Sequence, residues 1–403
     1  MIYRNRHRSH LNFGAGKSYG APPYNSKMKH HQFVIHSATG LAATERDTTV
    51  DLVLGFGRKS LLETESWYPA LREVYPKAVI GLCSTAGHIC GTEVTEEGIS
   101  LLALSFAHTR LRHRSVDNGD HPDSRSAGRA LVSGLLENDL RHVFVLSDGG
   151  SVNGSELTQG IQDVLPPRIP VTGGLAGDGK RFDYTVVGLN ETPRRGRIAA
   201  IGLYGNRLSV TQGSFDGWEP FGLVRKVTKS VGSELFEVDG KNALELYKRY
   251  LGKYAAELPG SALLFPLCIE TGGTDRHLVR TILGVDEARQ SLTFAGDMPE
   301  GSRVRFMMAN RDRLIGAAST AARRATSQPD QNPEVAILIS CVGRKIVLGS
   351  RVEEEVEAVR DVFGPDAALA GYYSYGEIAP LESGGASVLH NQTMTITCFR
   401  EFE

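Results

Sequence analysis

The sequence is poor in cysteine, and its cysteines form no framework. Five occur in 403 residues, scattered as Cys83, Cys90, Cys268, Cys341 and Cys398. Their odd number and wide spacing argue against a disulfide scaffold, and the lack of a CxxC pair argues against a structural zinc site. Free thiols of this kind suit a reducing compartment, so we expect a cytoplasmic protein.

Long hydrophobic runs and a net charge are absent as well. No apolar stretch approaches the roughly 20 residues that span a bilayer, and the N-terminus has no secretory hydrophobic region. The formal net charge is −1, so no overall field attracts nucleic acid or an anionic membrane. The sequence also lacks a P-loop, a G-x-S-x-G elbow and an H-E-x-x-H pair. We therefore expect neither a membrane nor a nucleic-acid partner.

The first 32 residues differ in composition from the rest of the chain. Residues 1–30 contain six Lys and Arg and no acidic residue, with Gly, Ser, Asn and Pro among them. This composition predicts a disordered basic tail over 1–32. Three other interpretations fit the same residues: a segment for an anionic partner, a transit-like segment, and an upstream extension ahead of a start at Met28.

After the tail, strand patterns alternate with helix patterns. Residues 50–57 read as a buried strand and 66–76 as a helix, and this alternation predicts an α/β layer. Strand patterns separated only by short turns follow over 185–215 and predict antiparallel pairing. We expect an α/β protein of two intimately packed mixed domains with a large antiparallel content, the first over 33–220 and the second over 221–403.

Two small-residue loops follow predicted strands. The loop GGLAGDG at 173–179 leaves backbone N–H groups open to a ligand, and its Asp178 accepts hydrogen bonds; a tight turn that needs glycine for its shape explains the pattern equally. The segment GLCSTAGHICG at 81–91 places His88 between two thiols. A neutral imidazole is a good axial ligand for haem iron. The alternative is that both thiols are buried as small apolar groups and His88 lies on the surface.

A third cluster of polar residues lies in the last seventy positions. SCVGRK places a thiol and a fixed cation after a buried strand, GYYSYGEI follows another, and LHNQT precedes the last strand. The guanidinium of Arg344 can hold a carboxylate or phosphate bidentately. Packing offers alternatives, since aromatic residues beside strands are usually core and Glu377 would serve as a structural partner of Arg344. The candidate residues here are Cys341, Arg344, Tyr375, Glu377, His390 and Asn391.

These segments resemble the FIST domain over about residues 33–401. SCVGR, YSYGEI and LHNQT are similar to its C-terminal half. GGLAGDG and GWEPFG…VTKS…LFEVDGKNALELYKRYLG are similar to its N-terminal half and the join between the halves. The family's GCSTAGE-like segment reads GLCSTAGHICG here, with His88 in place of a glutamate.

The resemblance implies a sensory domain of bacterial signalling that binds a small ligand such as an amino acid. Such proteins are often encoded with histidine kinases or cyclic-di-GMP enzymes, and some stand-alone members bind haem and sense nitric oxide. This chain carries no kinase, methyl-acceptor or cyclase segment, so we expect a separate signalling partner. The imidazole of His88 is then a candidate ligand of haem iron, and His36, His277 and His390 are competing candidates. Any haem would be bound non-covalently, because the sequence contains no C-x-x-C-H motif.

We expect both halves of the chain to face one ligand cavity. The predicted contacts combine the loop at 173–179 with the C-terminal cluster. They are Gly174, Asp178, Cys341, Arg344, Tyr375, Glu377, His390 and Asn391. Two other classes of function remain: a hydrolase or amidotransferase that uses Cys341 or Cys83 as nucleophile, and a purely structural interaction module.

Overall fold

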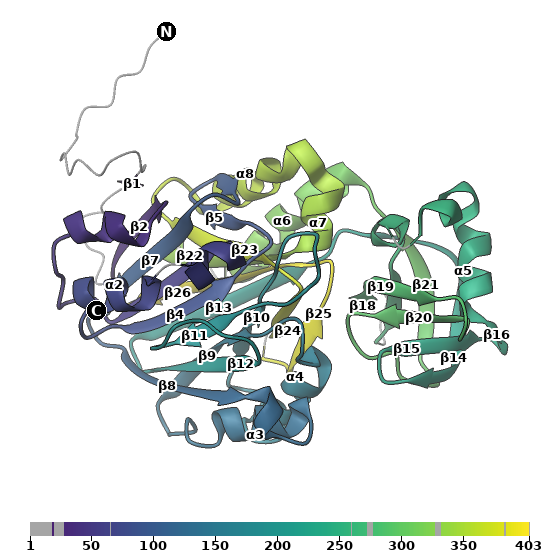
Figure 1. Cartoon of the computed structure of the whole chain (residues 1–403), viewed down its shortest axis with the longest axis horizontal. Helices are drawn as coiled ribbons and strands as arrows, with labels where there is room; N and C mark the ends of the chain where they lie inside the picture. Colours follow the sequence, from purple (N-terminus) through teal and green to yellow (C-terminus); the bar gives the residue numbers. More distant parts are fainter. Residues whose placement is uncertain are drawn as a thin grey trace, which may run out of the picture.

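The structure is a computed structural model that describes most of the chain. A main body made from the first and last parts of the chain carries a smaller β-domain made from the middle (Figure 1). Most of the predicted basic tail falls outside the described residues, but residues 29–32 form the start of a strand. The described ranges are 18–19, 28–64, 66–258, 260–271, 277–326, 332–382 and 384–402.

The first sheet of the main body holds the strand predicted over 50–57. Its strands follow in space as β1 (Ser18–Tyr19), β2 (Lys29–Ile35), β7 (Ile99–Ser105), β3 (Leu52–Gly57), β4 (Val79–Ser84) and β11 (Val187–Leu189). Only β3 and β4 pair in parallel. Side chains from the helices near this sheet complete a core on its outer face. These helices are η1 (Ala38–Ala43), α1 (Lys59–Thr64) and α2 (Trp67–Val74).

The second sheet joins strands from both ends of the chain. Their order is β25 (Ser387–His390), β24 (Gly376–Pro380), β10 (Val171–Leu175), β9 (Leu140–Ser147), β12 (Arg197–Tyr204) and β8 (Arg110–Asp117). The pair β9–β10 is parallel, and β10 meets β24 antiparallel. Residues of α3 and α4 pack on the outer face of this sheet. The helices between its strands are η2 (Asn118–Asp120), α3 (Ser124–Val132) and α4 (Gly154–Gln162).

The third sheet contains the continuous apolar strand of the C-terminal part. Its order is β13 (Leu208–Phe215), β26 (Met394–Glu401), β22 (Val335–Cys341), β23 (Ala368–Ser374), β5 (His88–Cys90) and β6 (Glu93–Thr95). The pair β22–β23 is parallel. Residues of α6, α7 and α8 pack on its outer face. The helices are α6 (Arg311–Ala325), α7 (Val342–Leu348), η5 (Gly349–Arg351) and α8 (Val352–Phe363).

All three sheets turn one face toward a common core. Successive side chains of a strand point to opposite faces, and the two faces of β22 illustrate the result. Ile337 and Ile339 join the common core, whereas Ala336 and Leu338 pack with residues of α6 and α8. Because both faces are buried, the strand reads as an unbroken apolar run, as is usual for strands covered on both sides.

The smaller β-domain contains the remaining strands and its own core. All its strand pairs are antiparallel, and it lies to one side of the main body (Figure 1). The strand order is β18 (His277–Arg280), β17 (Leu267–Glu270), β21 (Arg303–Met308), β14 (Glu219–Val231), β15 (Glu234–Val238), β20 (Ser291–Phe294) and β19 (Ile282–Asp286), with β16 (Lys241–Asn242) beside β15. The helices are α5 (Ala243–Leu251), η3 (Gly252–Glu257) and η4 (Gly260–Leu264).

The architecture confirms an α/β fold with a large antiparallel content. The chain leaves the main body after β13 and returns to it with α6, so both predicted halves contribute to the main body. The division of the chain at residue 220 stays a prediction. None of the helices in the described part of the chain combines the length and hydrophobicity that crossing a bilayer requires.

Backbone packing, not ligand contact, accounts for the first glycine of the GGLAGDG loop. Gly173 has φ +144°, and a Cβ there would lie 1.9 Å from the carbonyl oxygen of Val145. Replacing Gly173 with alanine should lower the free energy of unfolding by about 3 kcal/mol in urea titrations. Gly179→Ala is the matched control, because its φ is +63° and nothing lies within 4 Å of its Cβ position; its cost should be about 1 kcal/mol. Equal losses in both variants would contradict this packing role.

Candidate functional site

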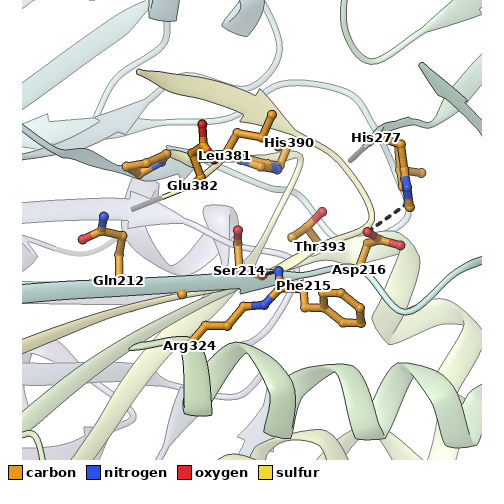
Figure 2. A pocket seen from close by; sticks show the side chains of 13 residues that line it. Gln212, Ser214, Phe215, Asp216, His277, Arg324, Leu381, Glu382, His390 and Thr393 are labelled. Atoms are coloured by element: carbon orange, nitrogen blue, oxygen red, sulfur yellow. Dashed lines mark hydrogen bonds and ion pairs between the residues drawn. The ribbon is translucent and has the colours of Figure 1, made fainter. Parts of the chain in front are cut away.

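A cavity of about 420 Å³ opens where the β-domain meets the main body (Figure 2). Its walls come from β13, β18, the last turn of α6, the end of β24 and the turn between β25 and β26. This volume lies within the usual range for small-molecule sites. The polar lining is Gln212, Ser214, Asp216, His277, Arg324, Glu382, His390 and Thr393, and the larger apolar lining is Phe215, Val279, Pro380 and Leu381.

Opposite charges reach this cavity from separate elements. The guanidinium of Arg324 lies over the ring of Phe215, with 4.5 Å to the centroid, and donates to the Ser214 carbonyl oxygen at 3.0 Å. Within the described ranges it has no carboxylate partner. The Asp216 carboxylate lies 3.3 Å from Nε2 of His277, which comes from the β-domain (Figure 2). The cavity therefore offers a cation from α6 and an anion at the junction.

His390 is the one residue of the predicted contact set that lines this cavity. It ends β25, directly opposite Glu377 of β24 in the antiparallel ladder. Its Nε2 lies 3.1 Å from the carbonyl oxygen of Ala379. Burial lowers the pKa of the imidazole to about 4. The ring is therefore neutral near pH 7, and it offers hydrogen bonding without charge.

Glu377 lies behind the cavity wall and holds that wall in place. Its side chain is fully buried. Ser374 Oγ donates to Oε1 at 2.5 Å, and the backbone N–H of Thr393 donates to Oε2 at 3.2 Å. Burial raises the pKa of the carboxyl to about 8, although both hydrogen bonds act in the opposite direction. Because Thr393 lines the cavity, Glu377 positions the backbone of a lining residue.

Arg344 binds other protein groups and not the cavity. Its Nε and Nη2 donate to Glu355 Oε2 at 3.0 and 2.7 Å, so Glu355 and not Glu377 is its acidic partner. Further hydrogen bonds reach the carbonyl oxygens of Asp216 at 2.5 Å and Leu314 at 2.7 Å. The guanidinium is fully buried and well supplied with acceptors. Its effect on the cavity is indirect, through the backbone of Asp216.

The rest of the C-terminal cluster is buried beside the cavity wall. Asn391 is fully buried, and its amide has no hydrogen-bond partner among the described residues. Gln392, which follows it, has φ +60°, and its carbonyl oxygen accepts from Trp218 Nε1 at 3.0 Å. Cys341 precedes α7, and burial raises the pKa of its thiol. These residues shape the turn that carries Thr393.

The GGLAGDG loop faces a second cavity, of about 280 Å³. Gly87 of the 81–91 segment lines the same space as Asp178, so the two small-residue loops do meet. The C-terminal cluster is divided: His390 lines the larger cavity, whereas Tyr375 braces the loop by donating to the Gly179 carbonyl oxygen at 3.3 Å. Gly174 lies within β10, where a Cβ would meet side chains of β22 and β23. The predicted contacts that line a cavity therefore lie at two separate cavities, His390 at the larger one and Asp178 at the second.

The residues around His88 do not fit haem. Burial and the nearby Lys345 ammonium lower the pKa of the imidazole to about 4, so the ring is neutral. The side chain is fully buried in β5 and lines neither of the two larger cavities, and a porphyrin needs an open slot beside its axial ligand. Among the described residues, no group of three His, Cys, Asp or Glu is placed to hold a metal ion. Haem binding stays a prediction.

Sequence reasoning missed the charged residues of the larger cavity. Arg324 sits in an Ala-rich helix, where an arginine usually faces solvent, and Asp216 precedes a turn. The sequence points to His277 only as a candidate iron ligand. The one available signal was the position of Asp216, immediately before the GWEPFG segment of the family resemblance.

Removing the Arg344 guanidinium should destabilise the fold. Arg344→Leu leaves Glu355 charged and unpaired in the interior, so the free energy of unfolding should fall by about 3–5 kcal/mol. The control is Arg323→Leu on α6, an exposed position, where the change should stay within about 0.5 kcal/mol. Urea unfolding followed by circular dichroism measures both. A loss below 1 kcal/mol for Arg344→Leu would argue against a central role for this ion pair.

Glu377 should make the protein less stable as the pH rises. Its folded pKa of about 8 exceeds the ordinary value of 4.5, so the native state retains a proton that the unfolded chain releases. The stabilisation is complete below about pH 4.5 and is lost as the pH approaches 8, with a slope of at most about 1.4 kcal/mol per unit. Glu377→Gln should reduce this slope between pH 6.5 and 8, measured by urea unfolding. Parallel curves for the two proteins would refute the raised pKa.

Comparison with known proteins places this architecture in a family. The FIST N domain matches residues 51–241, and the FIST C domain matches residues 243–380. An uncharacterized protein of Methanocaldococcus jannaschii is 26% identical over 309 residues, which are 70% of this chain and 58% of that protein, so the chain spans less than two thirds of this relative. The crystal structure of cyanuric acid hydrolase from A. caulinodans aligns over 93% of this chain and 99% of its own, at 10% identity and a TM-score of 0.36.

The two domain matches together cover most of the chain and confirm the resemblance seen in its motifs. FIST domains are associated with the sensing of small ligands in signalling proteins. With both domains matched in order along the sequence, this chain belongs to the FIST family.

Proposed function

We propose that the protein is a sensor that binds an amino-acid-like zwitterion in the 420 Å³ cavity and regulates a separate signalling partner. The observation that carries the proposal is the charge arrangement of the lining. Arg324 supplies a guanidinium without a described carboxylate partner, and Asp216 and Glu382 supply carboxylates within the same small volume. A zwitterion matches both signs at once.

Each end of such a ligand would find a group of opposite charge in the lining. The ligand carboxylate would accept hydrogen bonds from Arg324, and its ammonium group would donate to Asp216 or Glu382. Phe215 and Leu381 would cover its apolar part. Thr393 and His390 would add uncharged hydrogen-bonding groups from the turn that Glu377 holds.

The position of the cavity supports signalling by a change in domain arrangement. β18 of the β-domain supplies His277 and Val279, and the main body supplies the remaining lining. A ligand that contacts both bodies favours the arrangement in which both sets of contacts form. A partner such as a histidine kinase or a cyclic-di-GMP enzyme would then bind one arrangement in preference to the other.

The alternative, a cysteine-dependent hydrolase or amidotransferase, is less well supported. Cys341 and Cys83 are both buried, and burial raises the pKa of each thiol. The thiolate is the nucleophile in such enzymes, and reactive cysteines lie in electropositive, partly exposed surroundings. Neither thiol lines the 420 Å³ cavity. These observations favour a binding protein over an enzyme.

Ligand binding to purified full-length protein tests the proposal. Calorimetry against the twenty amino acids, with mass spectrometry of co-purified molecules, should reveal a zwitterion, and Arg324→Ala should weaken its binding about tenfold or more. Arg323→Ala, the neighbouring exposed arginine of α6, should retain the wild-type affinity. No zwitterion bound, or equal binding by both variants, would refute this site. A Soret absorption band, or uptake of added hemin, would favour haem instead.

A further inference from the structure

We propose that the 280 Å³ cavity is a second ligand site, which binds a phosphate group. It lies between the β3–α1 turn, the β4–β5 loop, the β6–β7 loop and the GGLAGDG loop. None of its lining residues also lines the 420 Å³ cavity. Ligand binding at each of the two sites can therefore be tested independently of the other.

The acidic residues of this cavity already have protein partners. The buried carboxylate of Asp178 binds Lys59 Nζ at 2.9 Å and also the guanidinium of Arg181. Glu96 binds Lys345 Nζ at 2.5 Å. Neither carboxylate therefore stands as an isolated negative charge that would repel an anion.

Two cationic residues that line the cavity have no carboxylate partner among the described residues. Arg58 and Lys180 line the cavity, both are exposed, and neither forms an ion pair within the described part of the chain. With Lys59, Arg181 and Lys345 they make five cations in and around the cavity, against the three carboxylates of Asp178, Asp183 and Glu96. The excess of two positive charges matches a phosphate group, which carries roughly −1.5 to −2 near pH 7.

The walls of this cavity are fixed without a ligand. Tyr375 Oη donates to the Gly179 carbonyl oxygen at 3.3 Å and accepts from the Phe182 N–H at 3.2 Å. The rings of Tyr375 and Phe182 stack with 4.7 Å between their centroids. On the opposite side, Lys345 Nζ donates to the carbonyl oxygen of Ala86 at 2.7 Å. A preformed site loses less entropy when a ligand binds.

Gly179 gives the ligand direct access to backbone, and Gly87 makes room for a cation. Gly179 has φ +63°, and nothing lies within 4 Å of the position a Cβ would occupy. Backbone bared as at Gly179 commonly cradles phosphate oxygens. Gly87 has φ +127°, and its lack of a side chain makes room for Lys345 Nζ, which would lie 2.5 Å from a Cβ there. A guanidinium fork and a mobile ammonium complete a suitable donor set for a phosphate.

Calorimetry with inorganic phosphate and pyrophosphate on the full chain, at low ionic strength, tests this proposal. Both should bind, and the double variant Arg58→Ala/Lys180→Ala should weaken binding about tenfold or more. The matched control is Arg168→Ala/Lys77→Ala, which removes one arginine and one lysine from exposed positions elsewhere. This control should bind phosphate as the wild type does.

Three results would overturn the proposal: no phosphate binding, equal weakening by both double variants, or equal binding of malonate, a dicarboxylate used as a charge-matched competitor. Retained binding of the zwitterion by Arg58→Ala/Lys180→Ala would show that the protein is folded and that the two sites are separate. Loss of phosphate binding in that same variant would then support the site.

Discussion

The buried ion pair between Arg344 and Glu355 is the interaction on which the C-terminal half depends. Glu355 of α8 accepts hydrogen bonds from Arg344, from Ser340 of β22 and from Tyr373 of β23. Arg344 also reaches the backbone of α6 and of Asp216. Since both charges are fully buried, each needs the other, and leaving one unpaired costs several kcal/mol. This one ion pair therefore connects two strands, three helices and the backbone at the edge of the larger cavity.

The core of the main body leaves the two proposed ligand cavities at its margins. The common core of three sheets fills the centre of the main body with side chains from all three. One margin faces the β-domain and the other lies under the GGLAGDG loop. Residues 374–377 lie between them: Tyr375 braces that loop, and Ser374 holds Glu377, which in turn holds Thr393 in the wall of the larger cavity.

Several features followed from local sequence. The apolar run of β22 identified a strand buried on both faces, and glycine-rich loops marked the ends of β4 and β10. The partner of Arg344 did not follow, because Glu355 lies in a run of glutamates that reads as a solvated helix face. Arg324 is exposed, as its place in an Ala-rich helix suggests, but only the approach of β13 and β18 makes it a cavity residue as well.

The sequence by itself determined the α/β class and the family. Such properties depend on periodicity and on short motifs, which local residues encode. Tertiary structure alone decided which charges meet. Burial removes solvent and selects partners far apart in the chain, as with His277 and Asp216 or Lys59 and Asp178. It also placed His390 and Asp178, which were expected in one site, in the linings of two different cavities.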